Sequence, residues 1–166
     1  MRSPEWSRCP TGALSFRRLD GGPGEAIPDN NRVTVAADGP LYVSGDLELR
    51  QAGQDTGRAE KRLALCRCGA SRNKPYCDNS HVEIGFSDPG DVDSERNRVE
   101  PQTRAETVFI TPLVNGSLQF KGPVKVSGAD EVGQAHMTSV SLCRCGESSK
   151  KPFCDGTHRE AGFEAD

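Results

Sequence analysis

Hydrophobic residues occupy every second position in two parts of the chain, one within residues 31–50 and the other within residues 107–126. The alternating residues of the first part are Val33, Val35, Leu41, Val43, Leu47 and Leu49. Those of the second part, which follow the segment TVFI, are Leu118, Phe120, Val124 and Val126. A period of two is typical of strands that bury one face. We therefore predict two short strands in each part, with a third strand following at Leu65 and at Leu142.

The two parts are copies of one unit. A shift of 77 residues, the distance from Cys66 to Cys143, aligns them without a gap. The matching pairs include Gly39 and Gly116, Leu41 and Leu118, Gly45 and Gly122, Leu65 and Leu142, and the Gly-Phe pairs at 85–86 and 162–163. Units of about 55 residues bury little core alone, so we expect the two copies to pack about a pseudo-twofold axis. The predicted fold class is mostly β with short helical turns.

This pattern divides the chain into four regions. Residues 1–30, rich in Gly, Pro and charge, predict an irregular N-terminal arm, and residues 31–86 form the first repeat. Residues 87–106 are charged and predict a linker, and residues 107–166 form the second repeat. Gly45-Asp46 indicates a turn or a bulge, and residues 51–61 read as a polar connection. His136 falls in a polar stretch that predicts a loop with a solvated histidine.

Each repeat contains a segment in which cysteine and histidine are concentrated. Residues 66–81 read CRCGASRNKPYCDNSH, and residues 143–158 read CRCGESSKKPFCDGTH; we call them the first and second metal segments. Of the 7 cysteines and 3 histidines of the chain, only Cys9 and His136 lie outside them. The candidate metal ligands are Cys66, Cys68, Cys77 and His81 in the first segment and Cys143, Cys145, Cys154 and His158 in the second.

The spacing within each segment suits metal ligation. Two cysteines two residues apart can face a common side of an extended turn. The third cysteine and the histidine are four residues apart, which places them on one face of a helical turn. Pro75 and Pro152 precede that turn, and Asp78 and Asp155 are in position to cap it. Three thiolates and one imidazole suit either a tetrahedral zinc ion or a 2Fe–2S cluster, and ligation chemistry alone leaves both open.

The second metal segment resembles the CDGSH iron–sulfur signature of the NEET protein family. It reads CDGTH at residues 154–158, preceded by Cys143-x-Cys145 with Ser148 and Pro152. The first segment reads CDNSH, with Asn79 where the family has glycine. The resemblance implies one 2Fe–2S cluster per motif, held by three cysteines and an exposed histidine, and hence two clusters per chain. It also implies a β-rich cap, shared here by two repeats of one chain, so that we expect a monomer with an internal pseudo-twofold axis.

The resemblance further implies a role in electron transfer or in iron–sulfur cluster transfer, with a redox partner protein or an apo iron–sulfur acceptor as partner. The alternative function is a zinc-stabilised interaction module without a redox role, which would be colourless. We expect no enzyme, because the sequence contains no Ser-His-Asp pattern, no phosphate-binding glycine loop and no carboxylate pair outside charged loops. The side chains expected near the sulfur ligands, as donors or as solvated groups, are Arg67, Arg144, Ser71, Ser148, Lys74 and Lys151.

Composition narrows the remaining possibilities. The net charge of −3 offers no basic field for nucleic acid or an anionic membrane. No apolar run approaches the ~20 residues that span a bilayer, and we expect neither a signal peptide nor a membrane anchor. We therefore expect a cytoplasmic protein whose thiols stay reduced. Residues 9–16, CPTGALSF, resemble the end of a ferredoxin-type cluster motif, but no partner cysteines precede Cys9, which predicts a packed or free thiol.

Overall fold

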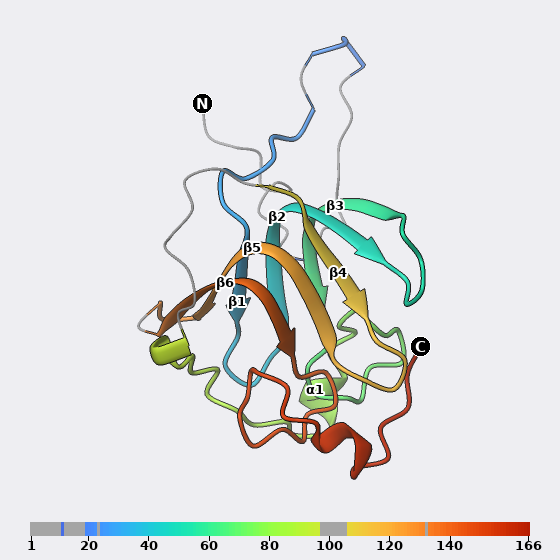
Figure 1. Ribbon diagram of the computed structural model, residues 1–166, viewed down its shortest axis with the longest axis vertical. Helices are drawn as coiled ribbons and strands as arrows, with labels where there is room; N and C mark the ends of the chain where they lie inside the picture. Colours follow the sequence, from blue (N-terminus) through green and yellow to red (C-terminus); the bar gives the residue numbers. More distant parts are fainter. Residues whose placement is uncertain (1–10, 12–18, 23, 97–105, 132) are drawn as a thin grey trace.

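A computed structural model describes residue 11 and residues 19–22, 24–96, 106–131 and 133–166. Within these residues, six strands form a single sheet (Figure 1). The strands are β1 (Arg32–Val35), β2 (Leu41–Arg50), β3 (Gly57–Leu65), β4 (Val108–Pro112), β5 (Leu118–Gly128) and β6 (Gln134–Leu142). The helical elements are α1 (Ser80–Glu83), η2 (Ser94–Arg96) and η3 (Thr157–Arg159). The prediction of a mostly β protein with short helical turns is confirmed. None of the described helices is long and apolar enough to cross a membrane.

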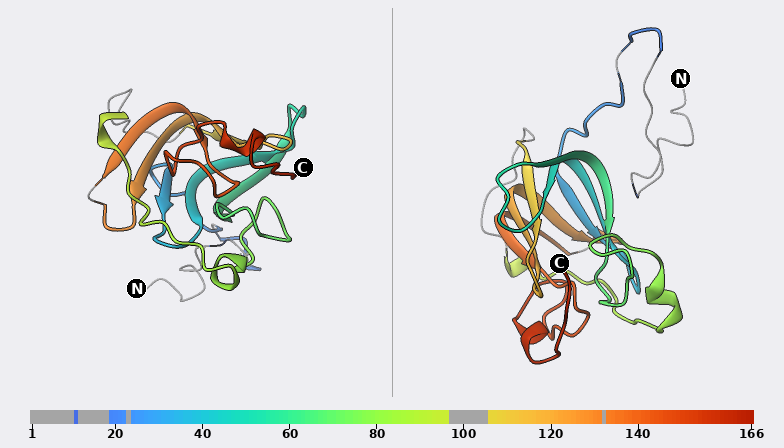
Figure 2. Two further views of the ribbon diagram at one scale, coloured as in Figure 1. Left: turned by 90° about the horizontal axis from the view of Figure 1, so that it is seen from below. Right: turned by 90° about the vertical axis from the view of Figure 1, so that its right-hand side faces the viewer.

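Four of the strands close into a ring, which gives the sheet its barrel-like shape (Figure 2). β1 is antiparallel to β2 and parallel to β5. β4 is parallel to β2 and antiparallel to β5. β3 and β6 lie outside this ring, paired antiparallel to β2 and to β5 respectively. Both metal segments follow these outer strands and lie at the same end of the barrel (Figure 1).

The strand registers repeat with the same shift of 77 residues as the sequence. Leu41 pairs with Leu65, and Leu118 pairs with Leu142. Each half also lends one strand to the other, because β1 pairs with β5 and β4 pairs with β2. The two repeats are therefore joined through a shared β-rich cap, as expected. The ring of four strands therefore closes only when both halves are present.

The hydrophobic core is built from the buried faces of all six strands. The alternating residues of the sequence pattern are buried, with the exception of Leu49, which is partly buried against the same core. The buried members are Val33, Val35, Leu41, Val43, Leu47, Leu118, Phe120, Val124 and Val126. Alternation predicted these elements correctly because a strand points successive side chains to opposite faces.

A bulge interrupts β2 at Gly45 and β5 at Gly122. Gly45 has a φ of 145°, and an added Cβ would collide with the side-chain oxygen of Asn31. That side chain accepts a hydrogen bond from Asp46 N at 2.8 Å and donates to Glu106 O at 2.6 Å and to Pro123 O at 3.1 Å. Asn31 thus ties the bulge of the first half to the backbone of the second. The prediction of a turn or bulge at Gly45 is confirmed as a bulge.

Two loop predictions were wrong. β3 begins at Gly57, so the polar connection is shorter than residues 51–61. β6 begins at Gln134, so His136 lies in a strand opposite Lys125 and not in a loop. The beginning of β3 is exposed and pairs with β2 along one edge, so it lacks a buried alternation. The beginning of β6 does alternate, because Ala135 and Met137 are buried on either side of His136. Cys9 lies outside the described residues.

Candidate metal centre

The first metal segment brings its donors together in two pairs. The sulfur atoms of Cys66 and Cys68 are 3.7 Å apart. The sulfur of Cys77 is 3.5 Å from Nδ1 of His81. Cys66 is buried and follows β3 directly, whereas Cys68, Cys77 and His81 are half-buried. An isolated bridge between Leu65 and Tyr76 brings the second pair back beside the first.

The second metal segment has the same arrangement. Cys143 Sγ lies 3.6 Å from Cys145 Sγ, and Cys154 Sγ lies 3.5 Å from Nδ1 of His158. Leu142 and Phe153 form the matching bridge. All eight ligand candidates of the sequence are therefore placed as four close donor pairs, two in each segment. The six described cysteines are free thiols.

The pair distances match the bite of a single tetrahedral metal. With a metal–sulfur bond of about 2.3 Å, two sulfur ligands of one tetrahedral ion lie about 3.8 Å apart. With a metal–nitrogen bond of about 2.05 Å, a sulfur and a nitrogen ligand lie about 3.5 Å apart. Each donor pair of both segments falls close to these values. Within the described part of the chain, no three or more Cys, His, Asp or Glu side chains converge on a single ion position.

Each helical turn carries the histidine but not the cysteine that it was expected to carry. Cys77 precedes α1, and Cys154 precedes η3, so each cysteine and its histidine do not share one helix. The pairs are close because a tight turn follows each cysteine. Asp78 stabilises that turn without being the N-cap, since its Oδ1 accepts from Ser80 N at 3.0 Å and Ser80 Oγ at 2.6 Å. Asp155 accepts from Thr157 in the same way.

These hydrogen bonds lower the pKa of both aspartates. The Ser80 hydroxyl is the largest cause for Asp78, followed by the backbone amides of Arg72 and Ser80. The Thr157 hydroxyl and amide lead for Asp155, followed by Ser149. Both carboxyls stay ionised at neutral pH, so the turn between the cysteine and the histidine of each donor pair keeps its hydrogen bonds at that pH.

The six side chains considered as sulfur donors or as solvated groups bind backbone oxygens instead. Ser71 Oγ donates to Tyr76 O at 2.6 Å, and Lys74 Nζ donates to Ser71 O at 2.6 Å. Ser148 and Lys151 make the equivalent bonds to Phe153 O and Ser148 O, both at 2.7 Å. These residues brace the loop between the two donor pairs. The remaining two, Arg67 and Arg144, are buried and also bind backbone oxygens.

The donors that do reach sulfur are backbone amides. Ala70 N lies 3.5 Å from Cys68 Sγ, Glu147 N lies 3.4 Å from Cys145 Sγ, and Asn79 N lies 3.4 Å from Cys77 Sγ. Sequence reasoning missed them because every non-proline residue carries an amide. The only local signal was the glycine that follows each Cys-x-Cys, since Gly69 and Gly146 have φ values of 82° and 87°.

Arg67 and Arg144 instead anchor the metal segments to the cap. Arg67 Nε donates to Gly39 O at 2.9 Å and its Nη2 donates to Ala36 O at 2.6 Å, while Nη1 pairs with the carboxylate of Asp88. Arg144 donates to Gly116 O at 2.9 Å, Leu113 O at 2.6 Å and Asp166 O at 3.0 Å. Each guanidinium therefore closes a strand turn onto the segment that carries the metal donors.

The thiol environments favour a charged sulfur at one position. The Cys68 thiol, followed by the amides of Ser71 and Gly69, lowers the pKa of Cys66 against the opposing effect of burial. The pKa of Cys68, the other member of the pair, is instead raised by its hydrogen bond to Cys66 and by burial. Burial also raises the pKa of Cys77, and the charge of Cys66 adds to this rise. In the second segment, burial raises the pKa of Cys145 to about 11. A thiolate is the form that binds metal, so within the first segment these shifts make Cys66 a more readily available ligand than Cys68 or Cys77.

The two metal segments touch at the pseudo-twofold axis. An added Cβ at Gly69 would collide with Cys145 O, and one at Gly146 would lie 2.6 Å from Cys68 O. The charge of Cys66 also acts on Arg144 of the other segment, opposing the burial that lowers the pKa of that guanidinium. Only glycine leaves room for the two backbones to approach so closely. The two sites are therefore neighbours in one molecule.

Asn79 adopts the backbone conformation that glycine has in the second segment. Its φ is 69°, and the φ of Gly156 is 94°. Asparagine enters this left-handed region more readily than other non-glycine residues. The departure of the first motif from the CDGSH pattern is therefore compatible with the same local turn.

We predict that Asn79→Gly leaves the first site intact and that Asn79→Val disturbs it. Valine in this conformation costs about 1–2 kcal/mol, whereas glycine carries no such cost. Thermal unfolding and the rate of iron loss after addition of a chelator measure the effect. Gly156→Asn is the matched control in the second segment, where an added Cβ meets no atom within 4 Å. Equal iron retention in Asn79→Val and in the unmodified protein would contradict the prediction.

Comparison with known protein families bears on what this geometry binds. The family described as iron-binding zinc finger, CDGSH type, matches residues 38–82 and 115–159, together more than half of the chain. The first match covers β2, β3 and the first metal segment, and the second covers β5, β6 and the second metal segment. Comparisons with curated proteins and with solved structures give no match. The chain therefore belongs to the CDGSH family of iron-binding domains, which implies iron–sulfur cluster binding, and it carries the domain twice.

Proposed function

We propose that the chain binds two 2Fe–2S clusters and carries electrons, or whole clusters, to a partner protein. Cys66, Cys68, Cys77 and His81 would hold the first cluster, and Cys143, Cys145, Cys154 and His158 the second. The observation that carries the proposal is the division of each donor set into two pairs. One pair is two sulfurs at 3.6–3.7 Å, and the other is a sulfur and Nδ1 at 3.5 Å.

Two donor pairs of this kind suit a centre with two metals. In a 2Fe–2S cluster each iron takes two protein ligands, and the two donor pairs of each segment have the spacing of such ligands. A single zinc ion would instead draw all four donors of a segment to within about 3.8 Å of one another. The arrangement of the donors therefore favours the cluster over the zinc-stabilised interaction module.

The partial exposure of the histidine ligands also favours exchange of electrons or clusters with a partner. When bound, such a cluster accepts and returns one electron. His81 and His158 are half-buried, and their Nδ1 atoms face the sulfur partners, so that Nε2 occupies the opposite edge of each ring. Cys66 and Cys143, in contrast, are buried and directly follow β3 and β6 of the cap. The histidine side is the more accessible route for electrons and for cluster release.

Three thiolates and one neutral imidazole carry one negative charge fewer than four thiolates. This ligand set favours a reduction potential less negative than that of an all-cysteine site. We propose a carrier and not an enzyme of covalent chemistry, acting as a monomer in the cytoplasm. A reducing compartment keeps such thiols available for metal. Its partner is a redox protein or an apo iron–sulfur acceptor.

The first test is a visible spectrum with an iron and sulfide count. The proposal predicts a red-brown protein with about four irons and four sulfides per chain, two of each for every cluster. Anaerobic incubation with an apo plant-type ferredoxin then separates the two roles, since cluster donation transfers the colour to the acceptor and electron transfer does not. A colourless protein with two zinc ions per chain would refute the proposal.

We predict that replacing both histidines, His81→Cys and His158→Cys, makes the clusters harder to release and lowers their potential. The added thiolates place more negative charge on each site, which lowers the potential by on the order of 100 mV or more. Voltammetry and the rate of transfer to apo-ferredoxin measure the two effects. His136→Gln is the control, because that histidine lies in β6 outside both segments. An unchanged potential and release rate in the double variant would show that neither histidine is a ligand.

A further inference from the structure

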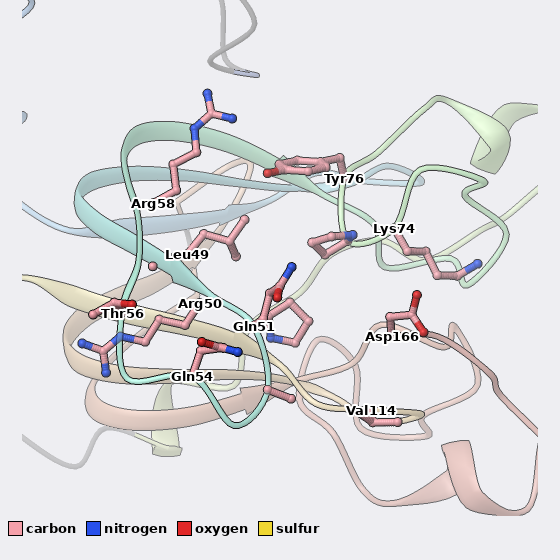
Figure 3. A pocket seen from close by; sticks show the side chains of 14 residues that line it. Leu49, Arg50, Gln51, Gln54, Thr56, Arg58, Lys74, Tyr76, Val114 and Asp166 are labelled. Carbon is pink, nitrogen blue, oxygen red and sulfur yellow. The ribbon is translucent and has the colours of Figure 1, made fainter.

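An open cleft of about 900 Å³ lies beside the first metal segment (Figure 3). Its walls come from the turn between β2 and β3, from Pro75 and Tyr76 of the metal segment, and from Val114 and Asp166 of the other half. Figure 3 shows the Tyr76 ring on one side and Val114 and Asp166 on the other, with Gln51 between them. The volume lies within the range of ligand-binding sites.

The symmetry-related position in the second half is covered by the chain itself. Gly128 and Gly133, the counterparts of the cleft residues Gln51 and Thr56, lie directly under residues 90–92. A Cβ at Gly128 would stand 3.1 Å from Gly90 O, and one at Gly133 would collide with Val92 O. Val92 is buried and belongs to the core. Residues 90–92, near the start of the charged stretch after the first repeat, therefore cover part of the second repeat.

The cover ends with an arginine over an aromatic ring. The guanidinium of Arg96 lies 4.5 Å from the centre of the Phe153 ring, and Phe153 is the counterpart of Tyr76. Asp93 Oδ2 is 3.7 Å from Arg96 Nε. An arginine above an aromatic face is a favourable contact when water is excluded. Under this cover Phe153 is only 4% exposed, whereas Tyr76 lines the cleft and is partly buried.

The cleft presents an aromatic face in the place of Phe153, and it also has a carboxylate of its own, whereas the carboxylate beside Arg96 belongs to the cover itself. Tyr76 supplies the aromatic face and Asp166 supplies a carboxylate across the cleft. Three cations line it, and each already has a partner. Arg50 pairs with Glu48 at 2.7 Å, Arg58 pairs with Glu60 at 2.8 Å, and Lys74 donates to Ser71 O at 2.6 Å. The cleft is therefore not strongly cationic and can receive a further arginine.

We propose that this cleft docks an extended segment of a partner protein in which an apolar residue is followed by an arginine. The apolar residue would lie against the side chains of the β2–β3 turn, farther from the backbone than Val92 lies from Gly133, because Gln51 and Thr56 stand where the second half has glycine. The arginine would cover Tyr76, as Arg96 covers Phe153. Tyr76 immediately precedes the ligand candidate Cys77, so the partner would be held beside the first site and not the second. The inference adds a docking surface to the proposed function and does not depend on which metal is bound.

Calorimetric titration of the holo-protein with a synthetic peptide tests the proposal. The peptide has the sequence of residues 88–96, DPGDVDSER, which covers the second half. We expect saturable binding of one peptide per chain. Replacing its arginine (Arg96→Gln in the peptide), or using protein with Tyr76→Leu or Asp166→Asn, should weaken binding about fivefold or more. Glu164→Gln, an exposed carboxylate outside the cleft, should leave the affinity unchanged.

The outcomes separate the docking surface from its alternatives. Absence of saturable binding, or equal affinity of the glutamine peptide, would overturn the proposal. Sedimentation that reveals a dimer lost in Asp166→Asn would assign the cleft to a second copy of the chain and overturn it also. The iron count of each variant is recorded in parallel, so that damage to the metal segment by Tyr76→Leu is not read as loss of docking. Failure of the cluster proposal would appear in that count and not in the titration.

Discussion

Cys154→Ser is expected to remove roughly half of the iron and sulfide from the chain and to leave the other half in place. A serine hydroxyl does not give the soft thiolate that such centres require, so the second site loses one of its four ligands. All four donors of each site come from one continuous segment, and the donor pairs of the first segment do not include any residue of the second. The first site therefore keeps its full ligand set.

The measurements are iron and sulfide analysis and the visible spectrum of the purified variants. Cys77→Ser should give the mirror result, and the double variant should lose both centres. Cys9→Ser is the control, because the sequence predicts a packed or free thiol there, and it should retain all the iron. The loops touch through Gly69 and Gly146. Complete loss of iron in either single variant would mean that the two sites do not assemble independently, contrary to this prediction.

The sequence was most informative where structure depends on near neighbours. Alternation predicted β2 and β5 because each strand buries one face in the hydrophobic core. The shift of 77 residues predicted that two halves share one architecture, and the strand registers follow it. Cysteine and histidine spacing predicted the two metal segments, because their donors lie within sixteen residues of each other in the chain. The donor pairs in the structure are the pairs that are closest in sequence.

What the sequence did not reveal depends on distant parts of the chain. β1 and β4 exchange between halves, and no local pattern distinguishes pairing with β2 from pairing with β5. The polar beginning of β3 is a strand only because β2 lies along one of its edges. In β6 the buried Ala135 and Met137 were a local signal, but their polar neighbours masked it. Arg67 donates to backbone oxygens 28 and 31 residues away in the chain. Its position in the motif alone could not distinguish this anchoring role from donation to a sulfur ligand. Its identity with Arg144 in the other repeat was the one signal that it matters.

Arg67→Met is expected to destabilise the protein by about 3–5 kcal/mol, the cost of breaking a buried ion pair on one side. The guanidinium is fully buried and is packed near the Phe86 ring, 5.0 Å from its centre. Its loss leaves the carbonyls of Gly39 and Ala36 and the carboxylate of Asp88 without their donor. Arg67→Lys should also be costly, because one ammonium on a flexible stem cannot reach three acceptors in a plane.

Arg144→Met should cost less, because its three hydrogen-bond acceptors are backbone oxygens and none is a side-chain carboxylate like that of Asp88. An unsatisfied buried carbonyl costs about 1–3 kcal/mol, and neighbouring losses do not simply add. Urea unfolding of the iron-loaded variants, at equal iron content, measures both effects. Arg72→Met is the control, since its side chain is 80% exposed and its pair with Glu83 at 3.5 Å contributes at most about 1 kcal/mol.

The order of the three arginine variants tests where the metal segments get their rigidity. If Arg67→Met unfolds no more easily than Arg72→Met, the anchoring of the first segment to the turn at Gly39 is not what stabilises it. If both buried variants are destabilised and also lose iron faster, the guanidinium of each half fixes the loop that supplies the ligands. The donor pairs would then owe their spacing to a contact made with the cap and not to the metal segment alone.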